Sequence, residues 1–457
     1  TMIVAKFGGT SVEDPAAIAR AVEIVRGRLV ARPLVVVSAL AGVTTALLAL
    51  ADQAARGQLV GAMSAISALR QRHLDAAAAV VPGPEGIELA GEVSVSFDEL
   101  ARLAEALTVF GYLTPRTLDA IAAQGELLSA PIVAAALRAR GVDAELVDPR
   151  QLMITDDTFG RAEPQPEAIA AAARECVLPL LRDGRLPVTG GFVGATRDGI
   201  TTTLGRGGSD YSASLLGAAL QADAIEIWTD VDGMLTADPR IVPHARLIER
   251  IRFDEAAELA SFGAKVLHPS TITPAVRRGI PVYVYNSRRP NGTGTLITAD
   301  APRRAVSAIA AKSETTVLKL RSARMLLAHG YLRMVFDVFH RHNTSVDVIA
   351  TSEVSLSVTL DDASHLDALL ADLRAFGDVS VERGRGIVSV VGAGLTDDPS
   401  ALARAFGALG EGVRVHMATV SATGINLTLV LDSEQVGPSM RRLHDAFFGA
   451  AVAPEPI

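Results

Sequence analysis

The sequence predicts an α/β protein in which an open, mainly parallel sheet lies between layers of helices and is followed by two smaller modules. Short β-branched runs alternate with Ala-rich stretches through residues 2–300, which is the pattern of a sheet covered by helices on both faces. After about residue 300 the strands come in pairs and the helices become single. The order of elements there recurs once, at a spacing of about 70 residues. A length of 457 residues fits such a division into several domains.

The first part, residues 1–300, contains runs that we expect to form buried strands, because each is short, apolar and rich in β-branched residues. The runs are 2–7, 34–38, 186–189, 224–229 and 282–285. Ala-rich helical segments separate them. One helix has a clear start at Asp14-Pro15, since Asp14 can cap free backbone amides and Pro15 suits the first turn.

The second part contains two modules that we place at 305–383 and 384–457. The first predicted module has the order βαββαβ, which is typical of a ferredoxin-like fold. Its elements are 315–320, 331–342, 346–351, 354–360, 364–376 and 379–382. The order then recurs in 387–391, 400–409, 413–418, 425–431 and 434–447. The sequence alone leaves open whether one module is threaded through the other or follows it.

Composition excludes several classes of protein. Charged residues make up 21% and hydrophobic residues 49%, which favours a packed fold over disorder. The net charge of −8 is spread along the chain without a basic run, so nucleic acid is not an expected partner. The single cysteine, Cys176, excludes a disulfide or a cysteine metal cluster within one chain. With neither a long apolar run nor a signal-peptide pattern at the start, we expect a cytoplasmic location and no membrane contact.

A first glycine cluster, residues 6–11, connects the opening strand to the first helix. Gly8 and Gly9 let backbone N–H groups approach an anion closely, and Lys6 beside them supplies a positive charge. Such a cluster can bind phosphate. It can equally be a tight turn with a solvated lysine, and the cluster alone does not decide between the two.

A second glycine cluster, residues 201–210, leads directly into a helix predicted at 211–220. It gathers threonine hydroxyls, backbone amides, Arg206 and a helix N-terminus, all of which suit anionic groups. The cluster does not fit a Walker or a dinucleotide-binding fingerprint, because Asp210 stands where the last glycine of the latter belongs. Tyr211 likewise takes the place of the closing glycine of a serine hydrolase elbow. Three common enzyme classes are thereby disfavoured.

Together with three further segments, these clusters resemble the signatures of the aspartate kinases in that family's order. The segments that carry the resemblance are 6–12, 201–210, 228–233, 238–240 and 262–269. The repeats after residue 300 resemble the family's two ACT regulatory domains. The resemblance implies an amino acid kinase fold at 1–300, a regulatory ACT domain at 305–383, and a regulatory and dimerising ACT domain at 384–457.

The activity implied by this resemblance is transfer of the γ-phosphoryl group of ATP to the side-chain carboxylate of L-aspartate. This reaction is the first step towards lysine, threonine and methionine. The catalytic residues implied are Lys6 and Asp210. The residues implied for aspartate are Thr44, Glu126, Arg206, Ser209 and Asp210. The plain alternatives, from the residues alone, are that Ser38 and Thr44 cap the next helix and that Glu126 lies on a solvated helix face.

The resemblance also implies a nucleotide site, in which the glycines would present backbone N–H groups to phosphate oxygens. Its implied members are Lys6, Gly8, Gly9, Gly207, Gly208, Thr229, Asp230, Leu235, Arg240, Lys265 and Val266. Leu235 departs from the family, which commonly has a tyrosine there, so ring stacking and a hydroxyl are lost. Mg²⁺ is expected to arrive with ATP, and no protein ligand is assigned to it.

Lysine is the effector implied by residues 345–353, which resemble the effector loop of lysine-sensitive aspartate kinases. The implied contacts are Met325, Tyr331, Leu332, Val346, Asp347, Thr351, Ser352 and Glu353. Ala328 departs from the family, where a serine contact occurs. The plain alternative is a strand-to-strand turn with exposed Ser352 and Glu353.

Two other functions remain open at this point. The first keeps the fold but changes the acceptor to another carboxylate, carbamate or nucleotide, as elsewhere in the amino acid kinase superfamily. The second is a non-catalytic amino-acid sensor with a decayed kinase half, against which Lys6, Arg206 and Asp210 argue. Because ferredoxin-like modules often pair through strand edges, we expect at least a homodimer, or a dimer of dimers, formed through the ACT domains.

Overall fold

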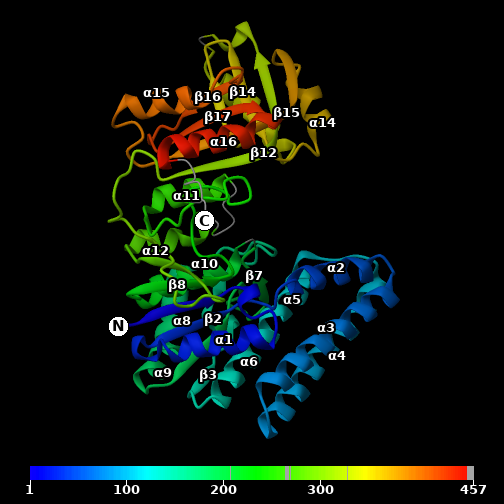
Figure 1. Ribbon diagram of the computed structural model, residues 1–457. Helices are drawn as coiled ribbons and strands as arrows, with labels where there is room; N and C mark the ends of the chain where they lie inside the picture. Colours follow the sequence, from blue (N-terminus) through cyan, green and yellow to red (C-terminus); the bar gives the residue numbers. More distant parts are fainter. Residues whose placement is uncertain (206, 263–266, 268, 327, 450–457) are drawn as a thin grey trace, which may run out of the picture. The chain divides into compact units, whose positions relative to one another are not determined.

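The structure is a computed structural model that describes residues 1–205, 207–262, 267, 269–326 and 328–449 (Figure 1). The chain divides into two compact units. The first unit contains residues 1–234 and 266–301, and the second contains residues 235–265 and 302–457. Each has its own sheet and its own core.

The main sheet of the first unit has the strand order β3-β5-β2-β1-β8-β10-β11. All neighbours are parallel except β10 and β11. The strands are β1 Ile3–Phe7, β2 Pro33–Val37, β3 Ala144–Leu146, β5 Leu186–Gly190, β8 Ala224–Thr229, β10 Val282–Asn286 and β11 Thr295–Ile297. Because the central strands are covered on both faces, they are continuous apolar runs, as the sequence predicted.

Helices cover both faces of this sheet, and the alternation of side chains along β1 decides which residues meet which helix. Ala5 and Phe7 belong to the core that the sheet shares with α1 and α6. Val4 points the other way, towards Gly217 of α10. Lys6, two residues after Val4, therefore points to the same side of the sheet as α10.

The helices of the first unit include a long antiparallel pair, α3 and α4, drawn in light blue in Figure 1. The helices are α1 Pro15–Arg26, α2 Val43–Ala55, α3 Leu59–Val80, α4 Pro84–Phe110, α5 Pro115–Ala122, α6 Gln124–Ala139, α7 Pro149–Leu152, α8 Pro166–Cys176, α9 Leu178–Arg182, α10 Gly208–Leu220 and α12 Thr273–Arg278. One stretch, Pro115–Ala139, is apolar and long enough to cross a membrane. Its most apolar window is 78% buried in the fold, as expected of a core helix.

A small second sheet lies beside the main one in the first unit. Its strands are β4 Ile154–Thr155, β6 Val193–Thr196 and β7 Thr201–Thr203, in the order β4-β6-β7. β7 leads directly into the second glycine cluster. The helix that follows, α10, begins at Gly208, three residues earlier than predicted, so Ser209 and Asp210 lie in its first turn.

The second unit is built on one six-stranded sheet with the order β13-β14-β12-β15-β17-β16. Its elements are β9 Arg250–Ile251, α11 Phe253–Ser261, β12 Ala308–Arg321, α13 Tyr331–Arg341, β13 Ile349–Thr351, β14 Ser355–Leu360, α14 Leu366–Leu373, β15 Asp378–Val391, α15 Pro399–Ala408, β16 Met417–Val420, β17 Asn426–Asp432 and α16 Ser433–Phe448. The strand predicted at 413–418 is found later in the chain, as β16. The strand predicted at 346–351 is shorter and corresponds to β13.

The two ferredoxin-like modules share their two longest strands, so one module is threaded through the other. The second half of β12 begins the first module, and the first half of β15 completes it. The first half of β12 pairs with the second half of β15, with Ala308 opposite Val391. Residues 308–312 thus supply the last strand of the second module, although they precede the first module in the chain.

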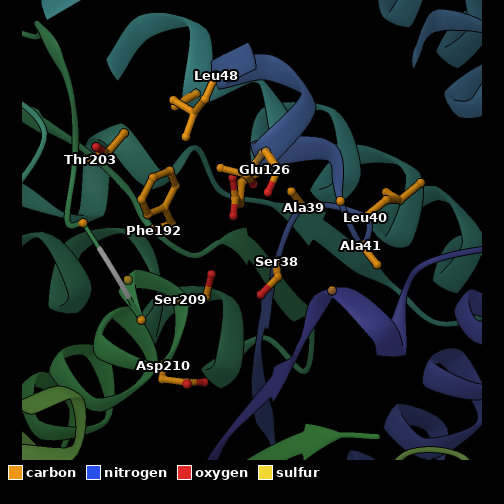
Figure 2. A pocket seen from close by; sticks show the side chains of 18 of the residues that line it. Ser38, Ala39, Leu40, Ala41, Leu48, Glu126, Phe192, Thr203, Ser209 and Asp210 are labelled. Atoms are coloured by element: carbon orange, nitrogen blue, oxygen red, sulfur yellow. The ribbon is translucent and has the colours of Figure 1, made fainter. Parts of the chain in front are cut away.

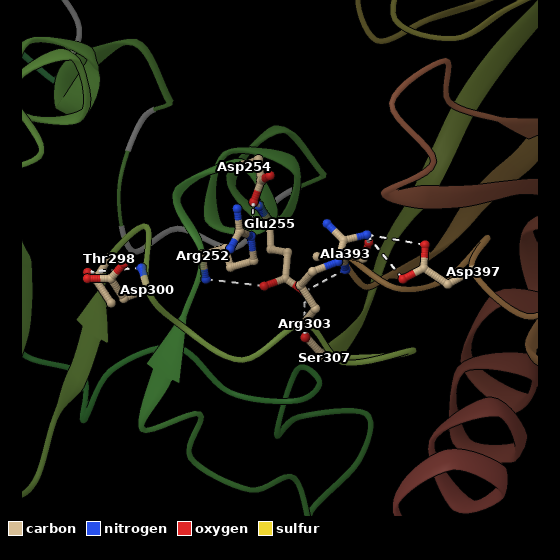
Figure 3. A network of polar contacts seen from close by, with 9 residues as sticks. All are labelled: Arg252, Asp254, Glu255, Thr298, Asp300, Arg303, Ser307, Ala393 and Asp397. Atoms are coloured by element: carbon tan, nitrogen blue, oxygen red, sulfur yellow. Dashed lines mark hydrogen bonds and ion pairs between the residues drawn. The ribbon is translucent and has the colours of Figure 1, made fainter.

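Glu255 at the start of α11 ties the segment 235–262 to this sheet (Figure 3). Its carboxylate accepts hydrogen bonds from the Ser307 hydroxyl and the Ala393 amide, both at 2.7 Å. It also accepts one from the backbone amide of Arg252 at 3.1 Å, which caps the helix. The side chain of Glu255 is fully buried, and these bonds satisfy its charge.

Candidate active site

A cavity of about 700 Å³ lies at the carboxyl ends of strands in the first unit (Figure 2). Loops after β1, β2 and β5 and the start of α10 form its wall, which is the usual place for a ligand in an open α/β sheet. The residues that line it and were predicted from the sequence are Lys6, Gly9, Thr44, Glu126, Gly207, Gly208, Ser209 and Asp210. The cavity therefore brings together residues that are up to 204 positions apart.

Lys6 and Asp210 form an ion pair in this cavity. Lys6 Nζ lies 2.6 Å from Asp210 Oδ1, and the two side chains are only 9% and 15% exposed. The pair forms because β1 directs Lys6 towards α10, whose first turn carries Asp210. A buried charge of either sign would be costly alone, so each residue offsets the cost of burying the other.

Glu126 is the second buried acid of the cavity, and it lies in the first turn of α6. Burial raises its pKa to about 8, although backbone hydrogen bonds at Ala39 and at Glu126 itself, and the charge of Lys6, act in the opposite direction. Glu126 Oε2 is buried and has no hydrogen-bond partner among the described residues. The alternative of a solvated helix face is therefore wrong, and the carboxyl group has an oxygen free for a ligand.

Asp119 is a site residue that the sequence analysis missed. From α5 it accepts hydrogen bonds from the amide of Gly160, at 2.9 and 3.0 Å, and from the amide and hydroxyl of Thr203, at 3.0 and 2.8 Å. The carboxylate is buried, and both of its oxygens accept hydrogen bonds. It fixes two loops that line the cavity. The one available signal was an acid between Leu118 and Ile121 on the apolar side of a helix.

Phe192 is the second missed residue, and it lies on the cavity wall (Figure 2). Its φ of 63° is in the left-handed region, which is unfavourable for a bulky side chain. The bond from its amide to Ser212 Oγ, at 2.9 Å, holds that conformation. Residues in strained conformations cluster at functional sites, so this strain supports a ligand-binding role for the cavity.

The glycines of the two clusters have different physical roles. A side chain at Gly208 would lie 2.5 Å from the ring of Phe192, and one at Gly9 would lie 3.0 Å from the Ala39 carbonyl. Gly207 has a φ of +72°. The amides of Gly8 and Gly208 already donate to Trp228 O and Gly205 O. The amides at these two positions are therefore already used within the chain, and of the two glycines Gly208 lines the cavity.

Thr44 lies in the first turn of α2, whose N-cap is Gly42. The alternative that Thr44 caps this helix is therefore wrong, and its side chain lines the cavity instead. Ser209 lines the same cavity (Figure 2). Arg206, predicted to bind the substrate carboxylate, lies outside the described residues.

The predicted nucleotide residues outside the two clusters do not line this cavity. Thr229 is the last residue of β8 and Asp230 follows it, with the Thr229 hydroxyl 3.3 Å from Asp230 Oδ1. Leu235 and Arg240 belong to the second unit, where Arg240 forms a two-pronged ion pair with Asp238. Lys265 and Val266 lie outside the described residues.

Most of the predicted effector residues gather in the first ferredoxin-like module. Tyr331 belongs to the core of this module, and Met325 and Val346 pack against it. The Tyr331 hydroxyl donates to Phe376 O at 2.7 Å. Leu332 is partly exposed on α13.

The loop between β13 and β14 carries the remaining predicted effector residues. Thr351 ends β13, while Ser352 and Glu353 are exposed in the turn that follows. Burial, together with a hydrogen bond to Asp361, raises the pKa of Asp347 to about 6, while the charge of Lys312 opposes the increase. The Asp347 carboxylate lies 3.8 Å from Lys312 Nζ.

Comparison with known proteins places this architecture in a family. Residues 1–286 match the model of the amino acid kinase family, and residues 388–447 match an ACT domain. The lysine-sensitive aspartokinase 3 of Escherichia coli is 40% identical over 98% of this chain and 99% of its own. Aspartokinase 2 of Arabidopsis thaliana, a chloroplast protein, is 34% identical over 97% of this chain and 84% of its own.

Solved structures of the Escherichia coli enzyme have the same fold as this chain. Aspartokinase III in complex with aspartate and ADP has a TM-score of 0.84 at 40% identity, covering 98% of this chain and 100% of that one. The complex with lysine and aspartate has a TM-score of 0.82 at 39% identity, covering 98% and 99%. The chain therefore belongs to the amino acid kinase family and, within it, to the aspartokinases.

Proposed function

We propose that the chain transfers the γ-phosphoryl group of ATP to the side-chain carboxylate of L-aspartate, with a catalytic part at 1–300 and regulatory modules at 305–383 and 384–457. The observation that carries the proposal is the buried Lys6–Asp210 pair beside Glu126 in one cavity. The aspartate and ADP bound to the Escherichia coli relative support it. A decayed kinase half would have no reason to keep this buried pair.

In the proposed mechanism, a carboxylate oxygen of aspartate attacks the γ-phosphorus, and the bond to the β-phosphate oxygen breaks to release ADP. The product is an acyl phosphate. Negative oxygens must approach one another, so catalysis depends on positioning and on neutralising charge. When the α-ammonium of aspartate binds at Glu126 and Asp210, it replaces Lys6 as the partner of Asp210. Lys6 is then free to face the transferring phosphoryl group.

Other predicted residues complete this proposed site. Thr44, Ser209 and Arg206 would hold aspartate, with Arg206 assigned to its α-carboxylate. Gly8, Gly9, Gly207 and Gly208 would admit the phosphates. The rest of the nucleotide would contact Thr229, Asp230, Leu235, Arg240, Lys265 and Val266.

Mg²⁺ would arrive with ATP and neutralise phosphate charge. Among the described carboxylates of the cavity, Asp119 is occupied by Gly160 and Thr203, and Asp210 by Lys6. Such a site fits an ion that keeps its waters and phosphate ligands, and we assign no protein ligand to it.

Lysine is the proposed inhibitor, and Met325, Tyr331, Leu332, Val346, Asp347, Thr351, Ser352 and Glu353 are its proposed contacts. Support comes from the lysine-sensitive relative and from the solved complex with lysine. Location in the cytoplasm, and a homodimer or dimer of dimers formed through the ACT modules, belong to the same proposal. The sheet of the second unit ends on β13 and β16, each with one ladder partner among the described strands.

A hydroxylamine trap tests the acceptor directly, because hydroxylamine converts an acyl phosphate to a hydroxamate, which forms a coloured complex with iron(III). The chain would be given ATP, Mg²⁺ and one carboxylic acid at a time: aspartate, glutamate, acetylglutamate or none. Hydroxamate with aspartate alone is the expected result. A greater yield with another acid would reassign the acceptor, and no product with any acid would favour a sensor.

A further inference from the structure

The second unit contains a cluster of two histidines and one aspartate, which are side chains of the kinds that bind metal ions. The proposed mechanism does not use these residues. His244, His444 and Asp445 each place a ring nitrogen or a carboxylate oxygen within 4.8 Å of the others. The His244 and His444 rings meet edge to face with centroids 5.0 Å apart. His244 Nε2 is 2.8 Å from Asp445 Oδ1. Two of the residues come from α16 and the third from the segment that follows Leu235.

His444 is the member of the cluster that points to a ligand. Its side chain is fully buried, and its Nδ1 has no hydrogen-bond partner among the described residues. Its Nε2 lies 2.8 Å from the hydroxyl oxygen of Thr236, which also accepts from the Arg246 amide at 2.8 Å. If Nε2–H donates to Thr236, Nδ1 carries a free lone pair. Such an outer hydrogen bond is what commonly orients a metal-binding histidine.

The charges around the cluster allow a cation. Asp445 supplies one negative charge. Arg246 supplies the opposing positive charge that reaches His444. The net charge of the cluster without an ion is therefore close to neutral, and a divalent ion would be held mainly by ligand bonds.

We propose that His244, His444 and Asp445 bind one Zn²⁺ ion, with water as the fourth ligand. Two imidazoles and one carboxylate are an ordinary ligand set for this ion. Ligand atoms around tetrahedral zinc lie about 3.3 Å apart, given bonds of about 2.0 Å. Ligand atoms that lie as far as 4.8 Å apart must therefore approach each other by about 1.5 Å when the ion binds. His244 and Asp445 are partly exposed and can make this movement, whereas His444 is fixed by Thr236.

The ion would join the segment 236–246 to α16. That segment already extends the regulatory sheet, since the Ile309 amide donates to Thr236 O at 2.8 Å. It also carries Arg240, a proposed nucleotide contact. Zinc binding should therefore stabilise the second unit against unfolding, because only the folded chain assembles the three ligands.

Zinc titration of the full, untagged chain after removal of metals with EDTA tests the proposal by calorimetry. We expect one Zn²⁺ per chain and a higher midpoint of thermal unfolding when it is bound. His244→Ala with Asp445→Asn should weaken binding by at least about 100-fold, and Thr236→Val by about 10- to 100-fold. Arg246→Met should strengthen binding by removing the opposing charge. His340→Ala, which removes an exposed histidine of α13, is the matched control.

Cobalt substitution gives a second readout, because a tetrahedral site gives Co²⁺ strong visible absorption bands. The bands should form in the native chain and in His340→Ala and be lost in the double variant. Since the replaced side chains are partly exposed, that variant should fold, which circular dichroism will verify. Equal zinc affinity in the double variant and the control overturns the proposal, as does the absence of stoichiometric binding in the native chain.

Discussion

The proton on Glu126 decides how the cavity receives its substrate. With a pKa of about 8, this carboxyl group is about nine-tenths protonated at pH 7 when the cavity is empty. An ammonium group beside it favours the charged form and lowers the pKa. If Glu126 holds the α-ammonium of aspartate, as proposed, substrate binding must drive off this proton.

We therefore expect aspartate binding at pH 7 to release up to about one proton per site. Calorimetry in buffers of different ionisation enthalpy measures this number from the slope of binding heat. The release should decline above about pH 8, because the group is then already ionised in the free enzyme. Glu126→Gln should bind more weakly and release none. An unchanged slope in Glu126→Gln would assign the proton to another group.

The same group makes a prediction for stability. Its folded-state pKa lies above the ordinary glutamate value of 4.5, so the folded chain binds the proton more tightly than the unfolded chain. The contribution of Glu126 to the free energy of unfolding is thus complete below about pH 4.5 and is lost as pH rises through about 8. Urea unfolding of Glu126→Gln should show a weaker decline across that range than the native chain.

Lys6 has two effects that can be separated by mutation. Lys6→Ala should reduce turnover by about 10²-fold or more, since it removes a preorganised charge at the transferring phosphoryl group. It should also destabilise the fold by about 3 kcal/mol, because Asp210 is left buried without a partner. Lys6→Ala with Asp210→Asn should recover stability without recovering activity. Recovery of both would remove Lys6 from the mechanism.

At the residue scale, the sequence pointed to side chains that stand inside recognisable glycine clusters. Lys6 and Asp210 follow from their clusters, and the structure brings them together. Asp119 does not follow, because its partners Gly160 and Thr203 lie 41 and 84 positions away. Phe192 does not follow either, because nothing in its sequence context indicates a positive φ.

Among the elements, α5 acts on the site through one carboxylate. Asp119→Asn keeps the size of the side chain but replaces an acceptor by a donor facing the amides of Gly160 and Thr203. We expect a loss of about 2 kcal/mol in stability and a raised KM for aspartate, because the loops at Gly160 and Thr203 would shift. Steady-state kinetics and thermal unfolding measure both. Asp98→Asn, at an exposed position on α4, is the control; an equal change there would dismiss a positioning role.

Element boundaries were predictable where the pattern was apolar and uninterrupted. β8 runs from Ala224 to Thr229, as predicted, because both faces of the sheet are covered and residues 225–228 are all buried. β13 begins only at Ile349, because the pairing just before it is irregular: the Asp347 amide donates to Thr359 O, the Thr359 amide donates to Val348 O, and the Val348 amide donates to the Thr359 side chain. Side-chain bonds of this kind compete with strand pairing and leave no periodic signal in the sequence.

For the whole molecule, lysine inhibition requires coupling between a regulatory module and the cavity, typically about 1 to 3 kcal/mol. Asp347 makes this coupling depend on pH if it holds an ammonium group of lysine. Its pKa is raised to about 6, so the carboxylate is charged at pH 7.5 and largely protonated at pH 5. Inhibition by lysine should weaken about 10-fold for each pH unit below about 6.

Initial rates over a lysine titration between pH 5 and 8 measure this effect, with threonine and methionine in parallel. Lysine should inhibit Asp347→Asn only weakly at every pH. Asp337→Asn, which changes an exposed position on α13, should show the same pH dependence of inhibition as the native chain. Glu353→Ala should also lose inhibition. Undiminished inhibition in Glu353→Ala would show that the loop after β13 is not the sensor.

The threading of the regulatory modules could not be predicted, because residues 308–312 look like the start of the first module's opening strand. Only the pairing of Ala308 with Val391 shows that they complete the second module. A strand of 14 residues is long enough to serve two modules in turn, and β12 and β15 both do so. Periodicity detects such a strand but not its partners.

This shared pair of strands constrains how the regulatory half can be inherited. Residues 383–386 look like the border between the two modules. Recombination between two homologous genes at this border would take residues 308–312, the closing strand of the second module, from one parent gene and its other strands from the second parent gene. The apolar contacts of Ile309 with Val388 and Val390 would then join side chains that had not evolved together. Crossovers before residue 302 avoid this mismatch, so we expect the two modules to be inherited together.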